Sequence, residues 1–345
     1  MGTEKLVKKN IRKLKPYEAK EITCRVKLDA NESPYGFTDA LKSILKIETN
    51  RYPDPEATEL RATLAKSWGV GISNILHGNG SDELIYCLIN TFGGPVMYPS
   101  PTFSMYGIIA KTLNEKAFSV SLGKNFELDA EKMRKGLKAE KPRLLFLSSP
   151  NNPTGNSFDR RDIEKLIKES KGIVVVDEAY QPFSPRESFM KSVRRHPNLV
   201  VLRTLSKVGL ASLRSGFVVG RKEIIDEVNK VRLPFNVNSL SQAVAVSALK
   251  NKKGMNDSIK TIVRERNILF EKLRGIRGIK VFESDANFIL FKVKSADSIY
   301  KGLLSRGVLV RNLSDVIKGC LRVTVGRPEE NNVFIKELTE IVSKM

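Results

Sequence analysis

The sequence predicts an α/β protein in which a mostly parallel sheet lies between helices and a smaller α+β domain is attached. Apolar runs of strand length occur at 143–149, 172–177 and 199–202, and helical patterns separate them. Continuous apolar strands that alternate with helices indicate a mostly parallel sheet buried on both faces. After about residue 221 this alternation gives way to long helices and paired strands. We therefore expect a second, smaller core there.

The large domain is expected to span 45–235. Prolines brace turns at 31–34 and 50–55, and a helix is expected at 58–68. The further elements expected in this domain are a short strand from residue 75 with a glycine-rich turn, a helix at 84–92, a strand at 96–98, a helix at 161–169 and a strand at 215–220.

The small domain is expected to combine 1–44 with 236–345. A helix at 222–232 leads to it and breaks at Pro234, because proline cannot continue a helix. The elements expected beyond this point are a long helical stretch at 239–273, strands at 279–282 and 288–293, a helix at 296–306, strands at 308–311 and 319–325, and a closing helix from residue 329.

Composition limits the classes of function. With 345 residues and 41% hydrophobic content, the chain can form two cores and is not expected to be disordered. Its formal net charge of +21 suggests anionic partners, namely phosphorylated metabolites, nucleic acid or a membrane surface. The basic residues are spread along the chain without a polybasic block, zinc-finger spacing or RNA-binding aromatic motif, which argues against nucleic acid.

Membrane insertion, secretion and metal binding are not expected. The longest uncharged run, 84–110, contains Gly93-Gly94-Pro95 and two further prolines, so it predicts helix, turn and strand rather than a membrane span. The first residues lack the apolar core and cleavage site of a signal peptide. Three widely separated cysteines form no metal-binding pair and fit a reducing cytoplasm.

Three polar residues, Asn152, Asp177 and Lys207, fall at or just beyond the carboxyl ends of expected strands. In open α/β sheets these ends form the ligand crevice. Lys207 lies beside hydroxyl groups and near a second cation, Arg214, and could serve there as an amine nucleophile. A solvated surface lysine is the alternative in so basic a chain.

A glycine-rich turn precedes the helix at 84–92. Gly80, Ser81 and Asp82 would present free backbone N–H groups to an anion such as phosphate, although the turn is neither a Walker A loop nor a dinucleotide fingerprint. Ser81 or Asp82 could instead only cap the helix. Tyr106, where another helix begins, could cover a flat ligand or form part of the core.

An aromatic aldehyde that carries a phosphate would use all of these residues, and pyridoxal 5′-phosphate is that ligand. Lys207 would bind its aldehyde carbon covalently, and Asp177 would pair with the protonated ring nitrogen, which lets the ring withdraw electrons from a carbanion. The remaining contacts would be Gly80, Ser81, Asp82, Ser206 and Arg214 on the phosphate, Asn152 and Tyr180 on the ring hydroxyl oxygen, and Tyr106 on the ring face.

Short motifs, in order and at matching spacing, resemble the fold-type-I, class-II-type aminotransferases, most closely their histidinol-phosphate branch. They are GSDE at 80–83, SPNNPTG at 149–155, DEAY at 177–180, RTLSK at 203–207, LRSGF at 213–217 and GCLRVTVG at 319–326. With LKPY at 14–17 and LDANESP at 28–34, the resemblance covers nearly the whole chain. It implies a seven-stranded, mostly parallel sheet and bound pyridoxal phosphate.

The resemblance also implies a homodimer in which Tyr52 reaches the cofactor phosphate of the neighbouring subunit. Arg322 would receive the phosphate of histidinol phosphate or the α-carboxylate of glutamate, because a guanidinium donates two parallel hydrogen bonds to either. Tyr17, Asn31 and Arg311 are similar to residues near that pocket. The loop between Lys207 and Arg214 is one residue shorter than in many members, which leaves only its conformation open.

The implied reaction exchanges an amino group between L-histidinol phosphate and 2-oxoglutarate, giving imidazole-acetol phosphate and glutamate, in cytoplasmic histidine biosynthesis. An aromatic amino acid aminotransferase and a threonine-phosphate decarboxylase of the same fold are alternatives. The segments at 14–17 and 28–34 favour the histidinol-phosphate branch. A basic nucleic-acid- or membrane-binding protein without catalysis is the alternative from another class, and the complete set of site residues argues against it.

Overall fold

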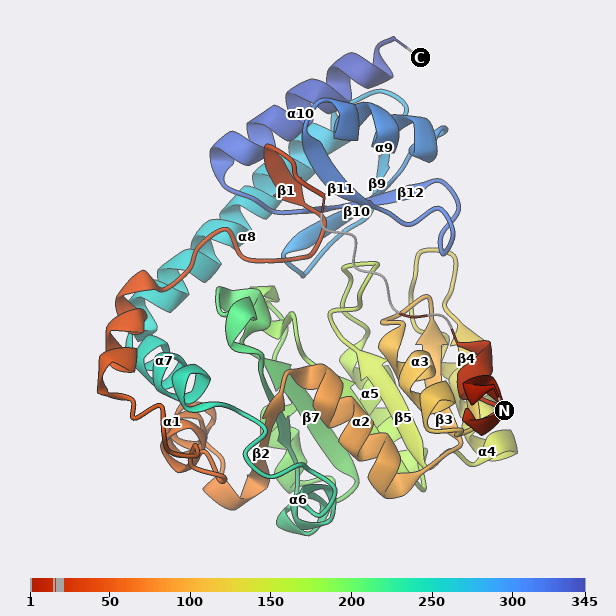
Figure 1. Ribbon diagram of the computed structural model, residues 1–345. Coiled ribbons are helices and arrows are strands. Elements are labelled where there is room, and N and C mark those ends of the chain that lie inside the picture. Colours follow the sequence, from red (N-terminus) through yellow and green to blue (C-terminus); the bar gives the residue numbers. More distant parts are fainter. Residues whose placement is uncertain (1, 15, 17–21, 345) are drawn as a thin grey trace.

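The computed structural model describes residues 2–14, 16 and 22–344 and contains two sheets (Figure 1). The larger sheet has seven strands in the order β2-β8-β7-β6-β5-β3-β4. All neighbours are parallel except β8, which runs antiparallel to both β2 and β7. The predicted mostly parallel seven-stranded sheet is therefore confirmed. Its strands are β2 (Ile75–Asn79), β3 (Val96–Ser100), β4 (Ala117–Ser121), β5 (Leu144–Ser148), β6 (Ile173–Asp177), β7 (Leu199–Thr204) and β8 (Ser215–Val219).

Helices cover both faces of this sheet, because alternate side chains of its central strands enter two separate apolar cores. The helices α2 (Ser81–Phe92), α3 (Met105–Thr112) and α6 (Lys222–Asn229) pack in one core. The helices α1 (Thr58–Trp68), α4 (Ala130–Glu140) and α5 (Arg160–Glu169) pack in the other. Every residue of β5 is buried, and each fully buried Leu or Val contributes about 1.5–3 kcal/mol.

The smaller sheet has five strands in the order β1-β11-β12-β10-β9. Its first strand comes from the N-terminal segment and pairs in parallel with β11. The predicted division into domains, at residues 44–45 and 235–236, stays a prediction. The elements are β1 (Val26–Leu28), β9 (Lys280–Val281), β10 (Phe288–Lys292), β11 (Val308–Asn312) and β12 (Cys320–Thr324), with α9 (Ala296–Ser305) and α10 (Pro328–Val342).

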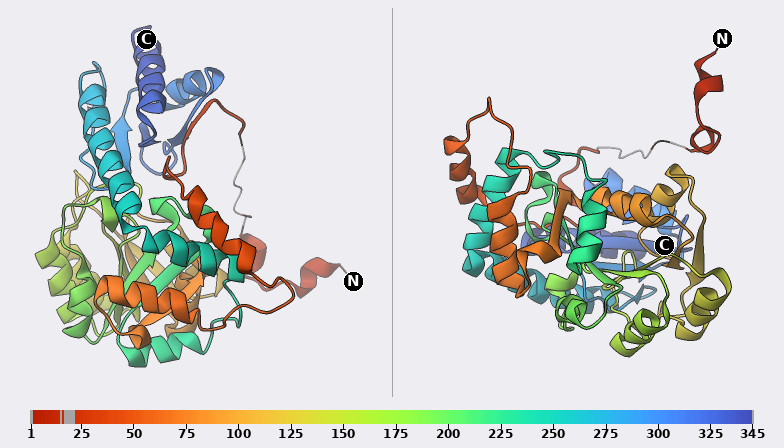
Figure 2. Two further views of the ribbon diagram at one scale, coloured as in Figure 1. Left: turned by 90° about the vertical axis from the view of Figure 1, so that its left-hand side faces the viewer. Right: turned by 90° about the horizontal axis from the view of Figure 1, so that it is seen from below.

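The long helical stretch predicted at 239–273 is two helices, α7 (Ser239–Lys250) and α8 (Lys252–Arg274). Asn251 separates them with φ −86° and ψ 60°, and its side chain accepts a hydrogen bond from Gly254 N–H, so it caps the second helix. Asparagine is favoured at such positions because its short side chain satisfies a free N–H. Figure 2 shows α8 rising from α7 to the smaller sheet.

Several elements were not predicted from the sequence, namely β4, α4 and the short 3-10 helices. The 3-10 helices are η1 (Thr3–Leu6), η2 (Ile11–Lys13), η3 (Thr38–Lys46), η4 (Ile72–Asn74), η5 (Gln181–Phe183), η6 (Phe189–Arg194), η7 (Ser206–Val208) and η8 (Ala211–Leu213). The chain begins beside the C-terminal end of α3, where Asn10 Nδ2 donates to the carbonyl oxygens of Lys111 and Thr112 at 3.1 and 3.0 Å. Within the described ranges, no helix is long and apolar enough to cross a membrane.

Candidate active site

One edge of the large sheet gathers the predicted site residues. Since β2 and β7 both run antiparallel to β8, the end of β2 at Asn79 lies at the same edge as the end of β7 at Thr204 and the start of β8 at Ser215. The parallel strands β5 and β6 end at this edge too. The edge therefore brings together the turn before α2, the loop that carries Lys207, and Asp177.

The glycine turn and Arg214 form a cradle at the N-terminus of α2. Gly80 has φ +83°, and a Cβ there would lie 2.6 Å from Arg214 Nη2, so only glycine admits the guanidinium this close. Arg214, itself left-handed at φ 50°, pairs with Asp82 Oδ2 at 3.4 Å. Ser206 lies at the adjacent strand end, where its hydroxyl meets Thr204 Oγ1 at 2.9 Å. Free N–H groups and a guanidinium suit a phosphate.

Asp177 ends β6 and is 4% exposed. Burial raises the pKa of its carboxyl to about 6, although hydrogen bonds from the Tyr106 hydroxyl at 2.7 Å and from Ala179 N–H at 3.0 Å act in the opposite direction. An ionised carboxylate in this position is poised to pair with a cation, because an opposite charge offsets the cost of burying it.

Lys207 lies within η7, immediately after β7, and is half-buried. Its Nζ donates to the carbonyl oxygen of Ala30 at 3.4 Å and lies 5.9 Å from the centroid of the Tyr180 ring. This single, long hydrogen bond to an uncharged oxygen uses only one of the hydrogens of the amine. The amine therefore remains available to another partner.

Tyr180 and Asn31 meet although they are far apart in the sequence. The Asn31 side chain donates from Nδ2 to the Tyr180 hydroxyl oxygen at 2.9 Å, and both residues are buried. Among the described residues, none accepts the hydroxyl hydrogen of Tyr180. This hydrogen is thus available to an oxygen of a bound molecule.

Arg322 connects the two sheets at the site. From β12 it donates to Asn152 Oδ1 at 2.5 Å and to the carbonyl oxygen of Asp29 at 2.7 Å, and its guanidinium lies 5.1 Å from the centroid of the Phe288 ring. Asn152 belongs to the loop after β5, so the predicted anion-binding arginine lies over the predicted cofactor residues. Within the described ranges, no group accepts from Asn152 Nδ2, which leaves this donor for a ligand.

Two predicted residues are exposed, and a third lies outside the described residues. Arg311 on β11 pairs in register with Arg322, so the two side chains leave the same face of the smaller sheet, and its contact with the substrate stays a prediction. Tyr52 is 82% exposed and stacks on Phe235 at 4.7 Å between ring centroids. Tyr17 lies outside the described residues.

Tyr106 lies in the core next to Asp177. Its side chain is fully buried, its ring stacks on Phe146 with centroids 4.6 Å apart, and its hydroxyl donates to Asp177. Tyr106 supports the Asp177 carboxyl in this way, and a contact of its ring with the face of a flat ligand stays a prediction. Phe103, half-buried in the loop after β3, meets the Tyr106 ring edge-on at 5.6 Å.

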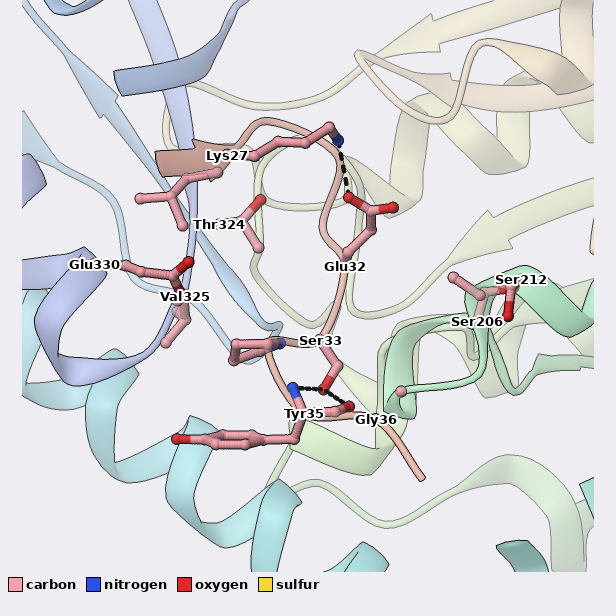
Figure 3. A pocket seen from close by; sticks show the side chains of 15 residues that line it. Lys27, Glu32, Ser33, Tyr35, Gly36, Ser206, Ser212, Thr324, Val325 and Glu330 are labelled. Atoms are coloured by element: carbon pink, nitrogen blue, oxygen red, sulfur yellow. Dashed lines mark hydrogen bonds and ion pairs between the residues drawn. The ribbon is translucent and has the colours of Figure 1, made fainter. Parts of the chain in front are cut away.

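A cavity of about 350 Å³ lies between the N-terminal segment, the loop that carries Lys207 and the start of α10 (Figure 3). Ser206 and Ser212 line one side, and Glu32, which is paired with Lys27 at 2.8 Å, lines the other. Neither Lys207 nor Asp177 is part of its lining. The cavity borders the site from the side of Ser206 and does not contain the reactive groups.

The arrangement fits pyridoxal phosphate. The space that a Gly80 side chain would fill is taken by the Arg214 guanidinium, which places a cation beside the backbone N–H groups at the start of α2. These are features of a preformed anion cradle. Asp177 supplies the anion for a ring nitrogen, and Lys207 supplies the amine. Within the described part of the chain, no cluster of residues could hold a metal ion.

Sequence reasoning missed Thr324 and Asn287. Thr324 and Asn287 are buried on the smaller sheet and hydrogen-bond Asn31. No local pattern marks these two, because their partner lies more than 250 positions away.

Comparison with known proteins agrees with this geometry. Residues 24–338 match the model of the family "Aminotransferase class I and II". The chain is 43% identical to the histidinol-phosphate aminotransferase of Aquifex aeolicus, covering 99% of both chains, and 42% identical to that of Hydrogenobaculum sp., covering 98% of this chain and 99% of the relative.

Solved structures share the fold. The histidinol-phosphate aminotransferase from Clostridium acetobutylicum superposes with a TM-score of 0.87 at 23% identity, covering 93% of this chain and all of the other. The L-threonine-O-3-phosphate decarboxylase from Porphyromonas gingivalis superposes with a TM-score of 0.81 at 25% identity, covering 92% of this chain and 99% of the other. The match of the family model over nearly the whole length, with relatives above 40% identity, establishes that the chain belongs to the aminotransferase class I and II family.

Proposed function

We propose that the chain is a pyridoxal-phosphate-dependent histidinol-phosphate aminotransferase. It exchanges an amino group between L-histidinol phosphate and 2-oxoglutarate, giving imidazole-acetol phosphate and glutamate, in histidine biosynthesis. The observation that carries this proposal is the group of relatives bearing that name, which are 39–43% identical to this chain over 95–99% of its length. Those relatives are matched over at least 95% of their own lengths, so the likeness is not confined to the cofactor-binding part.

Bound pyridoxal phosphate supplies an aromatic ring that accepts electrons from the α-carbon of the substrate. Asp177, ionised above its pKa of about 6, holds the proton on the ring nitrogen. Lys207 Nζ would hold the cofactor in the absence of substrate. Once free, the same amine would accept the proton of the substrate α-carbon. Its contact with the Ala30 carbonyl keeps the amine on the side of the site that faces the smaller sheet.

The remaining groups bind and orient. Gly80, Ser81, Asp82, Ser206 and Arg214 would hold the cofactor phosphate through backbone N–H groups, hydroxyls and the guanidinium. Tyr180 and Asn152 would donate to the ring oxygen. Arg322 would receive the phosphate or carboxylate of the substrate in a bidentate manner, because its planar guanidinium matches either anion. Its place between the two sheets supports this role, since a bound anion would then bridge them.

We propose that the chain forms a homodimer through the surface around Tyr52. Exposed apolar side chains occur there on η3, on the loop with Tyr52, in the segment between α6 and α7, and at the start of α7. They include Leu45 at 85% exposure, Leu233 at 70% and Leu240 at 45%. A second copy would cover this surface and bring Tyr52 to the neighbouring phosphate cradle. The three cysteines are unpaired, which supports the cytoplasm as the place of action.

A half-reaction panel tests the substrate assignment. The purified enzyme with bound cofactor is mixed with L-histidinol phosphate, phenylalanine, tyrosine or threonine phosphate, and the change in cofactor absorbance is followed. We expect histidinol phosphate to react with the highest second-order rate constant. A higher second-order rate constant for phenylalanine or tyrosine would identify an aromatic aminotransferase instead. Release of CO₂ from threonine phosphate would identify the decarboxylase, and no reaction with any amine would favour a non-catalytic binding protein.

A further inference from the structure

Asn31 has all four of its polar groups engaged although it lies in a connecting segment. Its N–H donates to Thr324 Oγ1 at 2.9 Å, and its carbonyl oxygen accepts from Asn287 Nδ2 at 3.0 Å. Its Oδ1 meets the Thr324 hydroxyl at 3.4 Å, and its Nδ2 donates to the Tyr180 hydroxyl at 2.9 Å. Three of these contacts come from the smaller sheet, and the fourth reaches into the large domain.

The network holds Asn31 in a left-handed backbone conformation. Its φ of 55° lies in the left-handed region, which is unfavourable for residues other than glycine, though asparagine tolerates it better than most. All four residues are buried, with exposures of 2% for Asn31, 3% for Thr324, 0% for Asn287 and 4% for Tyr180. Asn287 Oδ1 has no hydrogen-bond partner among the described residues, so this side chain is kept in the core for its donor group.

Thr324 also favours one of the two orientations of the Asn31 side-chain amide. Its Oγ1 accepts from the Asn31 N–H and donates its hydrogen to Oδ1, and this hydrogen would lose its acceptor if the amide were reversed, so the arrangement with Nδ2 toward Tyr180 is favoured. The tyrosine oxygen then accepts from Asn31, which directs its own hydrogen away from Asn31. An amide turned the other way would take up this hydrogen and remove it from any ligand.

We propose that Thr324 and Asn287 are positioning residues, which act through Asn31 to aim the Tyr180 hydroxyl hydrogen at the ring oxygen of the cofactor. The inference rests on the proposed function, because it takes pyridoxal phosphate as the ligand. It assigns to the smaller sheet a part in setting the charge on the cofactor ring, besides binding the substrate through Arg322. The Phe288 ring, which meets the Tyr180 ring edge-on at 5.1 Å, fixes the tyrosine from the same sheet.

The test compares Thr324→Val, which keeps the shape and loses the hydroxyl, with Thr324→Ser, which keeps the hydroxyl. The readout is the pH midpoint at which the absorption band of the bound cofactor changes in the resting enzyme. A hydrogen bond to the ring oxygen favours its anionic form, so its loss should raise the midpoint by about one pH unit in Thr324→Val and leave Thr324→Ser near wild type. Three charged groups lie around these hydrogen bonds and are unchanged in both variants, namely Lys207, Asp177 and Arg322.

Two controls separate positioning from general damage. Thr339→Val removes an exposed hydroxyl on α10 that bonds only the Ile335 carbonyl, and it should not move the midpoint. In a Tyr180→Phe background, Thr324→Val should cause no further shift, because the route through the tyrosine is already cut. If Thr324→Val does not fold or bind the cofactor, Asn287→Ala serves in its place and should raise the midpoint in the same direction.

An unchanged midpoint in a folded, cofactor-loaded Thr324→Val or Asn287→Ala enzyme would overturn the inference, as would an equal shift in the Tyr180→Phe background. These outcomes are distinct from failure of the proposed function. That failure would appear as a wild-type enzyme that binds the cofactor, and shows the midpoint shift in its variants, but does not react with histidinol phosphate.

Discussion

At the scale of one residue, Asp177 shows that a group suited to the site lowers the stability of the cofactor-free protein. Its carboxyl is buried, and burial raises its pKa to about 6 from an ordinary value of 3.8. In the protein without cofactor the ionised form therefore opposes folding, and the cost appears as the pH rises from about 4 to about 6. A cofactor cation would offset this cost by pairing with the carboxylate.

Asp177→Asn should stabilise the protein without cofactor and weaken cofactor binding. At pH 7.5 we expect the variant to be about 1–3 kcal/mol more stable in urea unfolding, with the difference shrinking towards pH 4.5, because the wild-type carboxyl is then protonated in the folded state. The affinity for pyridoxal phosphate should fall about 10- to 100-fold, since an ion pair is lost. A cofactor-free variant less stable than wild type at pH 7.5 would contradict this account.

Among single residues, the sequence predicts the positions of some site residues and not of others. It predicts those of Lys207, Asp177 and Asn152, because each residue follows an apolar strand and the sheet determines where the strand ends lie. For Tyr106 the sequence leaves open whether the ring covers a ligand or lies in the core, because the direction of a ring depends on helix register and packing. The spacing of Tyr106, Ile109 and Ala110 is helical, and the three share the buried face of α3. The contacts of Asn31 with Thr324 and Asn287 could not be foreseen, because only the tertiary fold brings them together.

At the scale of elements, β8 determines the shape of the phosphate cradle. Gly216 on β8 pairs with Gly78 on β2, and a Cβ at Gly216 would clash with the backbone of Gly80 and Ser81, where α2 begins. The close approach of β8 to this helix N-terminus is thus possible only with glycine. The sequence predicted the strand and the turn, but it did not predict that β8 runs antiparallel to its neighbours, because apolar runs carry no direction.

Gly216→Ala should therefore displace the N-terminus of α2 and damage phosphate binding. We expect a loss of about 1–3 kcal/mol in the free energy of unfolding, as for other overpacked positions, together with a weaker affinity for the cofactor. Gly220→Ala is the matched control just beyond the same strand, where the nearest contact of the new Cβ would be an ordinary 3.4 Å to Val200 Cγ2. Equal cofactor affinities for the two variants would show that the close approach is not needed.

At the scale of the whole molecule, the site draws on both sheets and, as proposed, on a second subunit. The five-stranded sheet contributes Arg322 and the residues that hold Asn31, while the seven-stranded sheet contributes the cofactor groups. The strand β1 links the two, because it pairs with β11 and continues directly into the segment with Asn31. Pairing of this strand with β11 supports the prediction that the N-terminal segment belongs with the C-terminal part of the chain.

Mixed dimers test the contribution of Tyr52. Lys207→Ala and Tyr52→Ala chains are each expected to lose activity, the second by about 10- to 100-fold if a hydrogen bond to the phosphate is lost. When the two chains are co-expressed with different tags and the hybrid is isolated, one of its two sites combines an intact Lys207 with the intact Tyr52 of the other chain. We expect the hybrid to regain about half of the wild-type activity per dimer. Activity no higher than half that of the Tyr52→Ala homodimer would show that Tyr52 acts within its own subunit.

The central claim is that Lys207 is the lysine that binds the cofactor, and chemical mapping tests it most directly. The loaded enzyme is treated with borohydride, which makes the bond between lysine and cofactor permanent, and is then digested and analysed by peptide mass spectrometry. We predict that the added mass of the reduced cofactor lies on Lys207 and that Lys207→Ala carries none. Cofactor mass on a different lysine in the wild-type enzyme, with Lys207 unmodified, would contradict the account.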